Sequence, residues 1–106
     1  MSKVTQFRQG DVLVVSVGSI PKGARKVARD NGRVVLAYGE VTGHAHAIVE
    51  EHVTMLEVDK GIRYLDVQME AFLRHEEHAP ITLPPGAYKV TRQVEYTPEA
   101  IRNVAD

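Results

Sequence analysis

Short β-prone stretches, separated by glycine and proline, follow one another along most of this 106-residue chain. Residues 12–17 and 34–38 are continuous apolar runs, and runs this short predict strands that are covered on both faces. From Glu40 to Glu50 the period is two, with alanine and glycine on one face and His44 and His46 on the other. Further strands are expected at 53–58, 62–67, 69–75 and 87–96.

Turn-forming residues mark the limits of these stretches. Asp59-Lys60-Gly61 predicts a hairpin connection, and proline at 80, 84 and 85 predicts two breaks. Thr97-Pro98-Glu99 predicts the start of a short C-terminal helix over 98–104. Seven or eight strands with little helix predict an all-β chain that forms a single domain, residues 1–106, as a small β-barrel or β-sandwich. Exposed strand edges in so small a domain favour a homo-oligomer.

Composition excludes several classes of protein. With no cysteine, the chain has neither a disulfide framework nor a thiolate zinc site. It contains no apolar run of about 20 residues and no apolar leader, so we expect a cytoplasmic protein without a membrane partner. The net charge of −1, and the lack of aromatic residues among the basic ones at 22–29, argue against a nucleic-acid partner.

Four of the five histidines occur in two close pairs, and this is the strongest functional signal in the sequence. His44 and His46 are two apart on one strand face, so both rings can reach one ion. His75 and His78, in a His-Glu-Glu-His step, become neighbours at a tight turn, where one or both could complete the site. The chain is therefore expected to hold a metal through His44, His46, His75 and His78, with zinc first and iron or manganese as alternatives.

Acidic residues near the histidines are the candidates for catalysis. Glu76 and Glu50 are the preferred pair, since a carboxylate beside a metal-bound water can act as a general base. The leading hypothesis is a hydrolase or lyase in which zinc activates water against a small-molecule substrate. An iron or manganese dioxygenase or isomerase is the second hypothesis, and a non-enzymatic binding or phage accessory module, with a structural metal or none, is the third. We expect His52 to lie off the site and Arg92 to pair with a carboxylate.

Two family resemblances follow from these motifs. His44-Ala-His46, followed by Glu50 and preceded by Gly39, resembles the metal half of the first cupin motif. That resemblance implies a jelly-roll fold and a further metal-binding histidine, for which His78 and His75 are the candidates. The proline and glycine of the second cupin motif come after these histidines here, at 84–86. The segments at 8–12, 39–46 and 75–80 also resemble a small uncharacterised bacterial and phage family.

Overall fold

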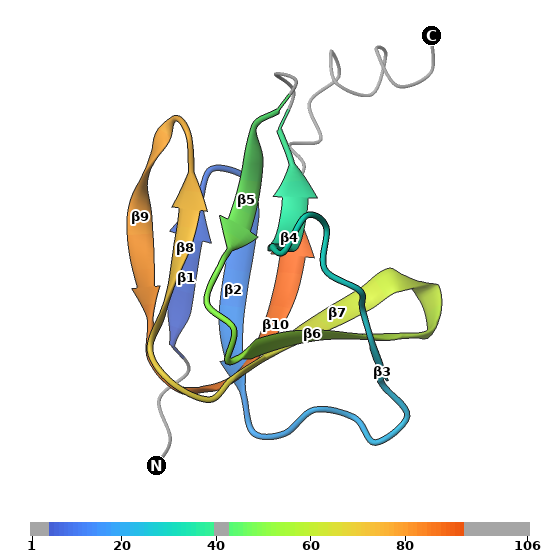
Figure 1. Cartoon of the computed structure of the whole chain (residues 1–106). Coiled ribbons are helices and arrows are strands. Elements are labelled where there is room, and N and C mark those ends of the chain that lie inside the picture. Colours follow the sequence, from blue (N-terminus) through green and yellow to red (C-terminus); the bar gives the residue numbers. More distant parts are fainter. Residues whose placement is uncertain (1–4, 40–42, 93–106) are drawn as a thin grey trace, which may run out of the picture.

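A computed structural model, which describes residues 5–39 and 43–92, contains ten strands arranged in two antiparallel sheets (Figure 1). The larger sheet has the order β1-β2-β10-β7-β6-β3: β1 is Gln6–Gln9, β2 Val12–Val17, β10 Gly86–Arg92, β7 Ile62–Val67, β6 Val53–Val58 and β3 Arg25–Lys26. The smaller has the order β4-β5-β8-β9: β4 is Val34–Tyr38, β5 Ala45–Ile48, β8 Ala71–His75 and β9 His78–Leu83. The expected small all-β fold is confirmed as two packed sheets, which do not close into a barrel over the residues described.

The two sheets share one hydrophobic core. Alternate residues of β2, β6, β7 and β10 point inward from the larger sheet and meet side chains of β4, β5 and β8 from the smaller one. Its most buried side chains are Val12, Val14, Ile48, Val53, Leu65, Val67, Leu73 and Leu83. Both faces of β4 are covered, as its continuous apolar run predicts. In β2, Leu13 is only half-buried, because the outer face of that sheet is partly exposed.

Three strands, β1, β3 and β9, were not expected from the sequence, and two of them, β1 and β9, border the functional site. Pro80 predicts a break in the chain, but it lies in β9, an edge strand, and edge strands tolerate proline because one side of such a strand has no ladder partner. β1 is a four-residue edge strand with only one apolar side chain, Phe7. The predicted helix over 98–104, and residues 93–96 of the last predicted strand, lie outside the described residues.

The connection between β6 and β7 agrees with the predicted hairpin, although it forms one turn of 3-10 helix over Asp59–Gly61. Gly61 has a φ of +76°, which explains why a glycine ends the turn. Over the residues that the structure describes, there is no helix with the length and apolar character needed to cross a membrane.

Candidate metal centre

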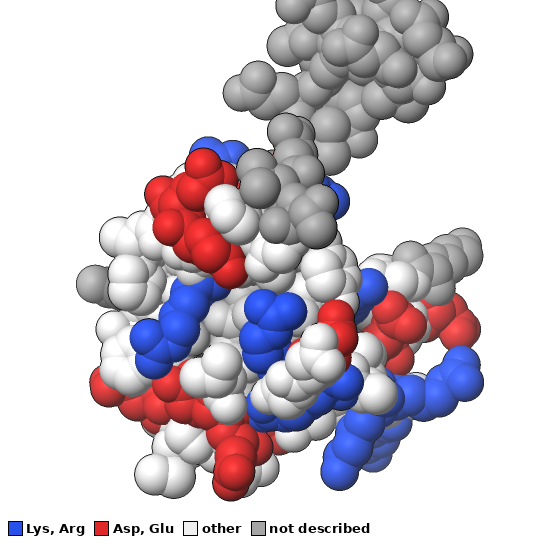
Figure 2. All heavy atoms as spheres, turned by 45° about the horizontal axis from the view of Figure 1, so that its top comes forward, with Lys and Arg blue, Asp and Glu red and all other residues white. Residues whose placement is uncertain are grey.

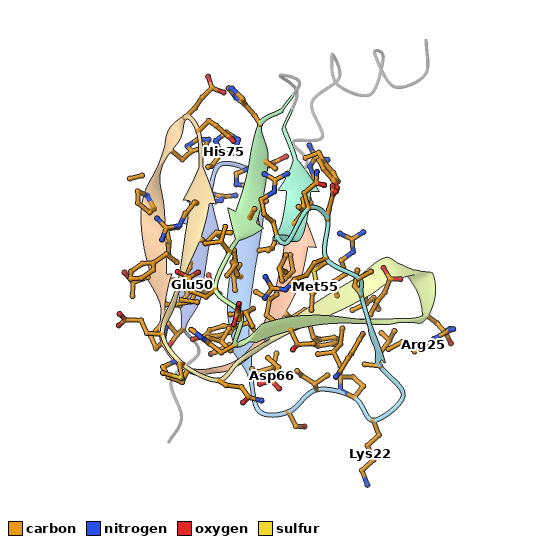
Figure 3. The ribbon with its side chains drawn as sticks, viewed as in Figure 1. Lys22, Arg25, Glu50, Met55, Asp66 and His75 are labelled. Carbon is orange, nitrogen blue, oxygen red and sulfur yellow. The ribbon has the colours of Figure 1, made fainter. Side chains whose placement is uncertain are left out.

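Three connections meet at one end of the sandwich and bring the histidines together. They are the turn between β1 and β2, the segment that leads into β5, and the turn between β8 and β9, which all lie at the top of Figure 1. Figure 3 labels His75 at this end, at the tip of β8. Residues more than 60 positions apart in the sequence therefore contribute to one site, which includes Gln9 and His75.

The rings of His44, His46, His75 and His78, here called the histidine cluster, form one connected group in which His75 neighbours each of the other three. The centroid of the His75 ring lies 4.2 Å from that of His46, 4.8 Å from that of His78 and 5.8 Å from that of His44. Burial decreases across the cluster: His46 is only 4% exposed, His44 and His75 are partly buried, and His78 is exposed. The cluster thus extends from the interior to the surface, as a site with an entry path requires.

The backbone explains why these four side chains converge. His46 points between the sheets together with Ile48, so the strand face that the sequence marks as polar is buried. His75 and His78 are register partners across the hairpin, and only Glu76 and Glu77 separate them. A register shift, with one extra residue on β9, separates the Leu73–Ile81 pair from the His75–His78 pair, and the His75 ring lies against that of His46. Both members of the His75/His78 pair therefore reach it.

Gln9 fixes the protonation of His46. The Gln9 Nε2 amide donates to the carbonyl oxygens of Leu73 and Ala79, at 3.0 Å each. Its Oε1 must therefore face His46 Nδ1, 2.9 Å away, and that nitrogen must carry the proton. The lone pair of His46 is left on Nε2, where a metal can take it.

Asp11 faces that free nitrogen. Its Oδ1 lies 3.7 Å from His46 Nε2, which is too long for a hydrogen bond but close enough for both atoms to bind one ion. Arg92 Nε donates to Asp11 Oδ2 at 2.8 Å, so the predicted pairing of Arg92 with a carboxylate is present. Partial burial acts to raise the pKa of Asp11, but the hydrogen bond and the charge of Arg92 outweigh it and lower that pKa.

The β8–β9 turn supplies carboxylates beside His44. Glu76 Oε1 accepts a hydrogen bond from the Ala45 amide at 2.9 Å, and this bond, more than any other contact, lowers the pKa of Glu76. Glu77 Oε2 lies 3.4 Å from His44 Nδ1, where it favours a proton on that nitrogen and leaves Nε2 for a ligand. The Glu77 amide donates to His75 Nδ1 at 3.0 Å, so His75 can bind a metal only after that hydrogen bond opens.

Two glycines allow the backbone to approach the rings closely. Gly10 has a φ of +60°, and a Cβ atom there would lie 2.9 Å from His78 Nε2 and 3.3 Å from His46 Cε1. A Cβ atom on Gly39 would lie 3.0 Å from the Cβ of His44 and 3.4 Å from His75 Nε2. Side chains at these positions would push into the cluster, so the site depends on both glycines.

One group of side chains at this end has the donor set and spacing of a metal site. His44, His75 and Glu76 each offer a ligand atom, and these atoms all lie within 4.8 Å of one another. Two histidines and one carboxylate are a common set for catalytic zinc and also for non-haem iron. Glu76, which the sequence analysis treats as a base, is thus placed where it could be a ligand.

The other residues considered from the sequence lie elsewhere. Glu50 accepts hydrogen bonds from the Phe72 amide and from Arg74, at 3.3 and 3.4 Å, and Figure 3 shows it well below His75 along the smaller sheet. The carboxylate that cupin-like spacing singles out therefore makes no hydrogen bond to the histidine cluster. His52, in the turn before β6, has its Nε2 3.0 Å from the Glu70 carbonyl oxygen, away from the site as expected.

Sequence reasoning missed Gln9, Gly10 and Asp11 as site residues. They belong to the segment 8–12 that carried the resemblance to a small uncharacterised family, but nothing in their spacing relates them to the histidines. Figure 2 turns this end of the molecule towards the viewer and shows acidic side chains gathered next to basic ones.

Acid should destabilise the metal-free protein. Burial, followed by the charge of His75, lowers the pKa of His46 below its ordinary value of 6.5. Below pH 6.5, His46 therefore binds a proton in the unfolded chain but stays neutral in the folded chain, so the free energy of unfolding falls as pH falls. The lowered pKa values of Asp11, Glu50 and Glu76 extend the loss below about pH 4.5. Urea unfolding from pH 7.5 to 5.0 in the presence of a chelator measures this slope. His46→Gln should flatten the slope, and an unchanged slope would contradict the assignment.

Comparison with known proteins gives one match. A family model described as a domain of unknown function (DUF8820) matches residues 8–93, a range that includes every residue of the candidate site. This match confirms the expected resemblance to a small uncharacterised family. No curated protein and no solved structure matches the chain.

Proposed function

Since the chain belongs to this family of domains of unknown function, we propose its activity from its site chemistry: it is a small metal-dependent enzyme that uses zinc-activated water. The observation that carries the proposal is the His44, His75 and Glu76 group, within 4.8 Å, inside a cluster of four histidines. Three protein ligands with a position left for water are the arrangement of catalytic zinc sites, whereas structural sites are closed.

The protonation states of His46 and His44 favour metal binding. Metals bind neutral imidazole, and burial keeps His46 neutral by lowering its pKa. Gln9 holds the proton on His46 Nδ1, which leaves the lone pair of that ring on Nε2, facing Asp11. Glu77, on the solvent side, favours a proton on His44 Nδ1 and so leaves a lone pair on His44 Nε2. Outer partners of this kind orient metal-binding histidines and raise their affinity.

Each residue then has a defined role. His44, His75 and Glu76 would hold the ion and leave one position for water, while His46, with Asp11 beside it, lies next to them on the interior side. A bound Zn²⁺ lowers the pKa of its water towards 7, which suits hydrolysis or hydration of a small electrophile. The Glu77 carboxylate, 63% exposed and next to His44, can accept the proton that such a reaction releases.

A second function uses the same residues with a different metal. Two histidines and one carboxylate also form the ligand set of non-haem Fe(II) oxygenases. The His44, His75 and Glu76 group therefore also favours an iron dioxygenase as the alternative, now through Glu76 rather than Glu50.

The test is the metal content and activity of the purified full chain. Protein expressed with excess zinc and dialysed should retain about one zinc ion per chain by elemental analysis and should hydrolyse 4-nitrophenyl acetate. Stripped protein reloaded with zinc should recover this activity, and protein reloaded with Fe²⁺ under argon should not. Retention of iron in preference to zinc, with oxygen consumption when the iron-loaded protein is then exposed to air, would favour the dioxygenase. If the purified protein retained no metal, the proposal would be refuted. If it retained metal but hydrolysed no substrate, the protein would be a metal-binding module and not an enzyme.

A further inference from the structure

A hollow on the outer face of the smaller sheet opens beside the proposed metal site. Its volume is about 280 Å³, and its lining is Arg33, Ala45, Ala47, Val49, Arg74, His75 and Glu76. The two alanines of β5 create the hollow, because their methyl groups lie between larger side chains of β4 and β8. It shares His75 and Glu76 with the three-residue metal group, so a molecule bound in it would reach the metal site.

The strand register orders the lining residues along β5. Glu76 bonds to the Ala45 amide at one end, Arg74 is the register partner of Ala47, and Arg33 precedes Val34, the partner of Ile48. Strands rise about 3.3 Å per residue, so the distance from Ala45 to Val49 is roughly 13 Å. The hollow therefore has a carboxylate and an imidazole at one end, one guanidinium group from Arg74 near its middle and a second from Arg33 at the other end.

Both arginines, Arg33 and Arg74, have N–H donors without a hydrogen-bond partner among the described residues. Arg74 is about half exposed, makes one 3.4 Å contact with Glu50, and has its guanidinium carbon 5.3 Å from the centre of the Phe72 ring. Glu50 also accepts a hydrogen bond from the Phe72 amide, and it contacts only one nitrogen of the Arg74 guanidinium group, so other N–H donors of Arg74 stay available. Arg33 forms no side-chain hydrogen bond to any residue that the structure describes. Two partly free guanidinium groups above an apolar floor bind carboxylate or phosphate well.

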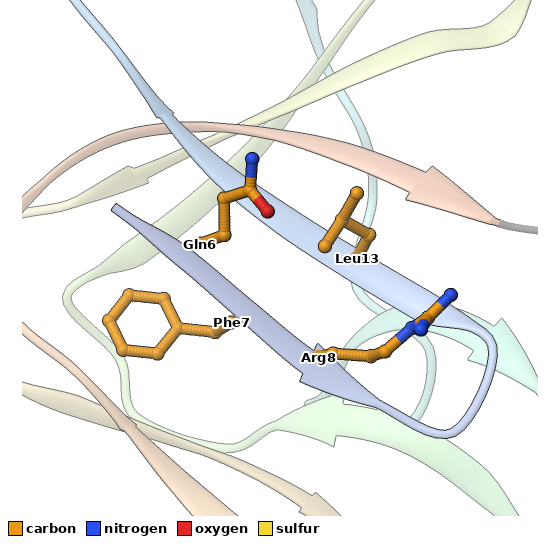
Figure 4. A pocket seen from close by; sticks show the side chains of 4 residues that line it. All are labelled: Gln6, Phe7, Arg8 and Leu13. Carbon is orange, nitrogen blue, oxygen red and sulfur yellow. The ribbon is translucent and has the colours of Figure 1, made fainter. Parts of the chain in front are cut away.

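Two other hollows among the described residues lack this combination. The one at the β1–β2 edge is lined by Gln6, Phe7, Arg8 and Leu13, and in Figure 4 the Phe7 ring points away from the other three side chains. Phe7 packs against the core instead, which leaves a single cation on that surface. The hollow at β3 and β6 places Glu57 and Asp59 among its cations, so its charges are already balanced.

We propose that the hollow between Arg33 and Glu76 is the substrate site and that it binds a small organic anion with a carboxylate or phosphate terminus. The oxyanion lies between Arg33 and Arg74, the apolar part rests on Ala45 and Ala47, and the reactive end points towards His75 and Glu76. The identification of this anion as a substrate rests on the proposed function, while its binding does not require the metal.

NMR titration of the full chain with butanoate and with inorganic phosphate, in the presence of a chelator, tests this inference. One or both anions should shift the amide signals of Ala45, Ala47 and Arg74 in a saturable way. The neutral butanamide should not, because it lacks the charge that the guanidinium groups recognise. The preferred anion identifies the terminus.

Variants then locate the site. Arg33→Gln and Arg74→Gln should each weaken binding about 10-fold or more, which is the loss expected for one charge-assisted hydrogen bond. Ala47→Leu should block binding by filling the hollow, and Arg25→Gln, an exposed arginine on β3, should leave binding unchanged. Absence of saturable shifts, equal binding of butanamide, or full affinity in both Arg33→Gln and Arg74→Gln would overturn the inference. Anion binding in a chain that retains no zinc would instead refute only the metal enzyme.

Discussion

His75→Ala should abolish tight zinc binding, because His75 is the ring through which the other histidines are connected. Its centroid lies within 6 Å of those of His44, His46 and His78, and it belongs to the His44, His75 and Glu76 group. Loss of an outer partner of a metal ligand already costs about 10–100-fold in affinity, so removal of a ligand should cost at least about 100-fold.

Thermodynamic linkage converts this loss into a shift in stability. At a free zinc concentration of 1,000 times the wild-type Kd, zinc should stabilise the native protein by about 4.1 kcal/mol. A 100-fold weaker site would retain about 1.4 kcal/mol of that at the same concentration. Isothermal titration calorimetry and thermal melts with and without zinc measure both quantities.

His52→Ala is the matched control. His52 also lies in a turn, between β5 and β6, but its ring contacts the Glu70 carbonyl oxygen and none of the four rings of the histidine cluster. It should leave the zinc affinity within about twofold of wild type. Equal affinity in wild type and His75→Ala would show that the cluster is a packing feature and not a metal site.

The period of two along residues 40–50 predicts part of this site. Alternation showed that His44 and His46 share a strand face, but it could not show that this face is buried, because the alanines opposite them are buried as well. The His-Glu-Glu-His step was correctly placed at a turn. Its two histidines face each other because β9 forms despite Pro80, and edge strands tolerate proline.

Long-range contacts explain the rest. Glu50 is near the histidines in sequence, yet β5 carries it away from them and Arg74 holds it there. Gln9 and Asp11 are over 30 residues from His46, and only the packing of the β1–β2 hairpin against β8 and β9 brings them to the site. Sequence proximity therefore favours Glu50, whereas Gln9 and Asp11 are the residues that lie beside His46, and no local pattern marks these two.

Gln9→Leu should produce the largest loss of stability at the site. Gln9 is 2% exposed and makes three hydrogen bonds, to His46 Nδ1 and to the carbonyl oxygens of Leu73 and Ala79. Leucine has a similar volume but no polar atom, so three groups would lose their partners, and two of them, the Leu73 carbonyl oxygen and His46 Nδ1, are in buried hydrogen bonds. Since a buried group left unsatisfied costs about 1–3 kcal/mol, we expect a destabilisation of about 3–5 kcal/mol after partial relaxation.

The same substitution should weaken metal binding for a separate reason. Without Gln9 Oε1, nothing holds the proton on His46 Nδ1, and the ring can place it on Nε2, the nitrogen that faces Asp11. Zinc affinity should fall about 10–100-fold. In the wild-type protein, two-bond ¹H–¹⁵N spectra should show a protonated Nδ1 and a lone pair on Nε2 of His46, and in Gln9→Leu this preference should disappear.

Gln6→Leu provides the control on the same strand. Gln6 is exposed and lies three residues before Gln9 in β1, so its replacement changes the residue type and strand propensity equally but removes no buried hydrogen bond. Its urea midpoint and zinc affinity should stay close to those of wild type. If Gln9→Leu matched Gln6→Leu in both measurements, the buried amide would have no part in positioning His46. A loss of stability with an unchanged His46 tautomer would restrict Gln9 to a structural role, because only a positioning residue controls where the proton lies.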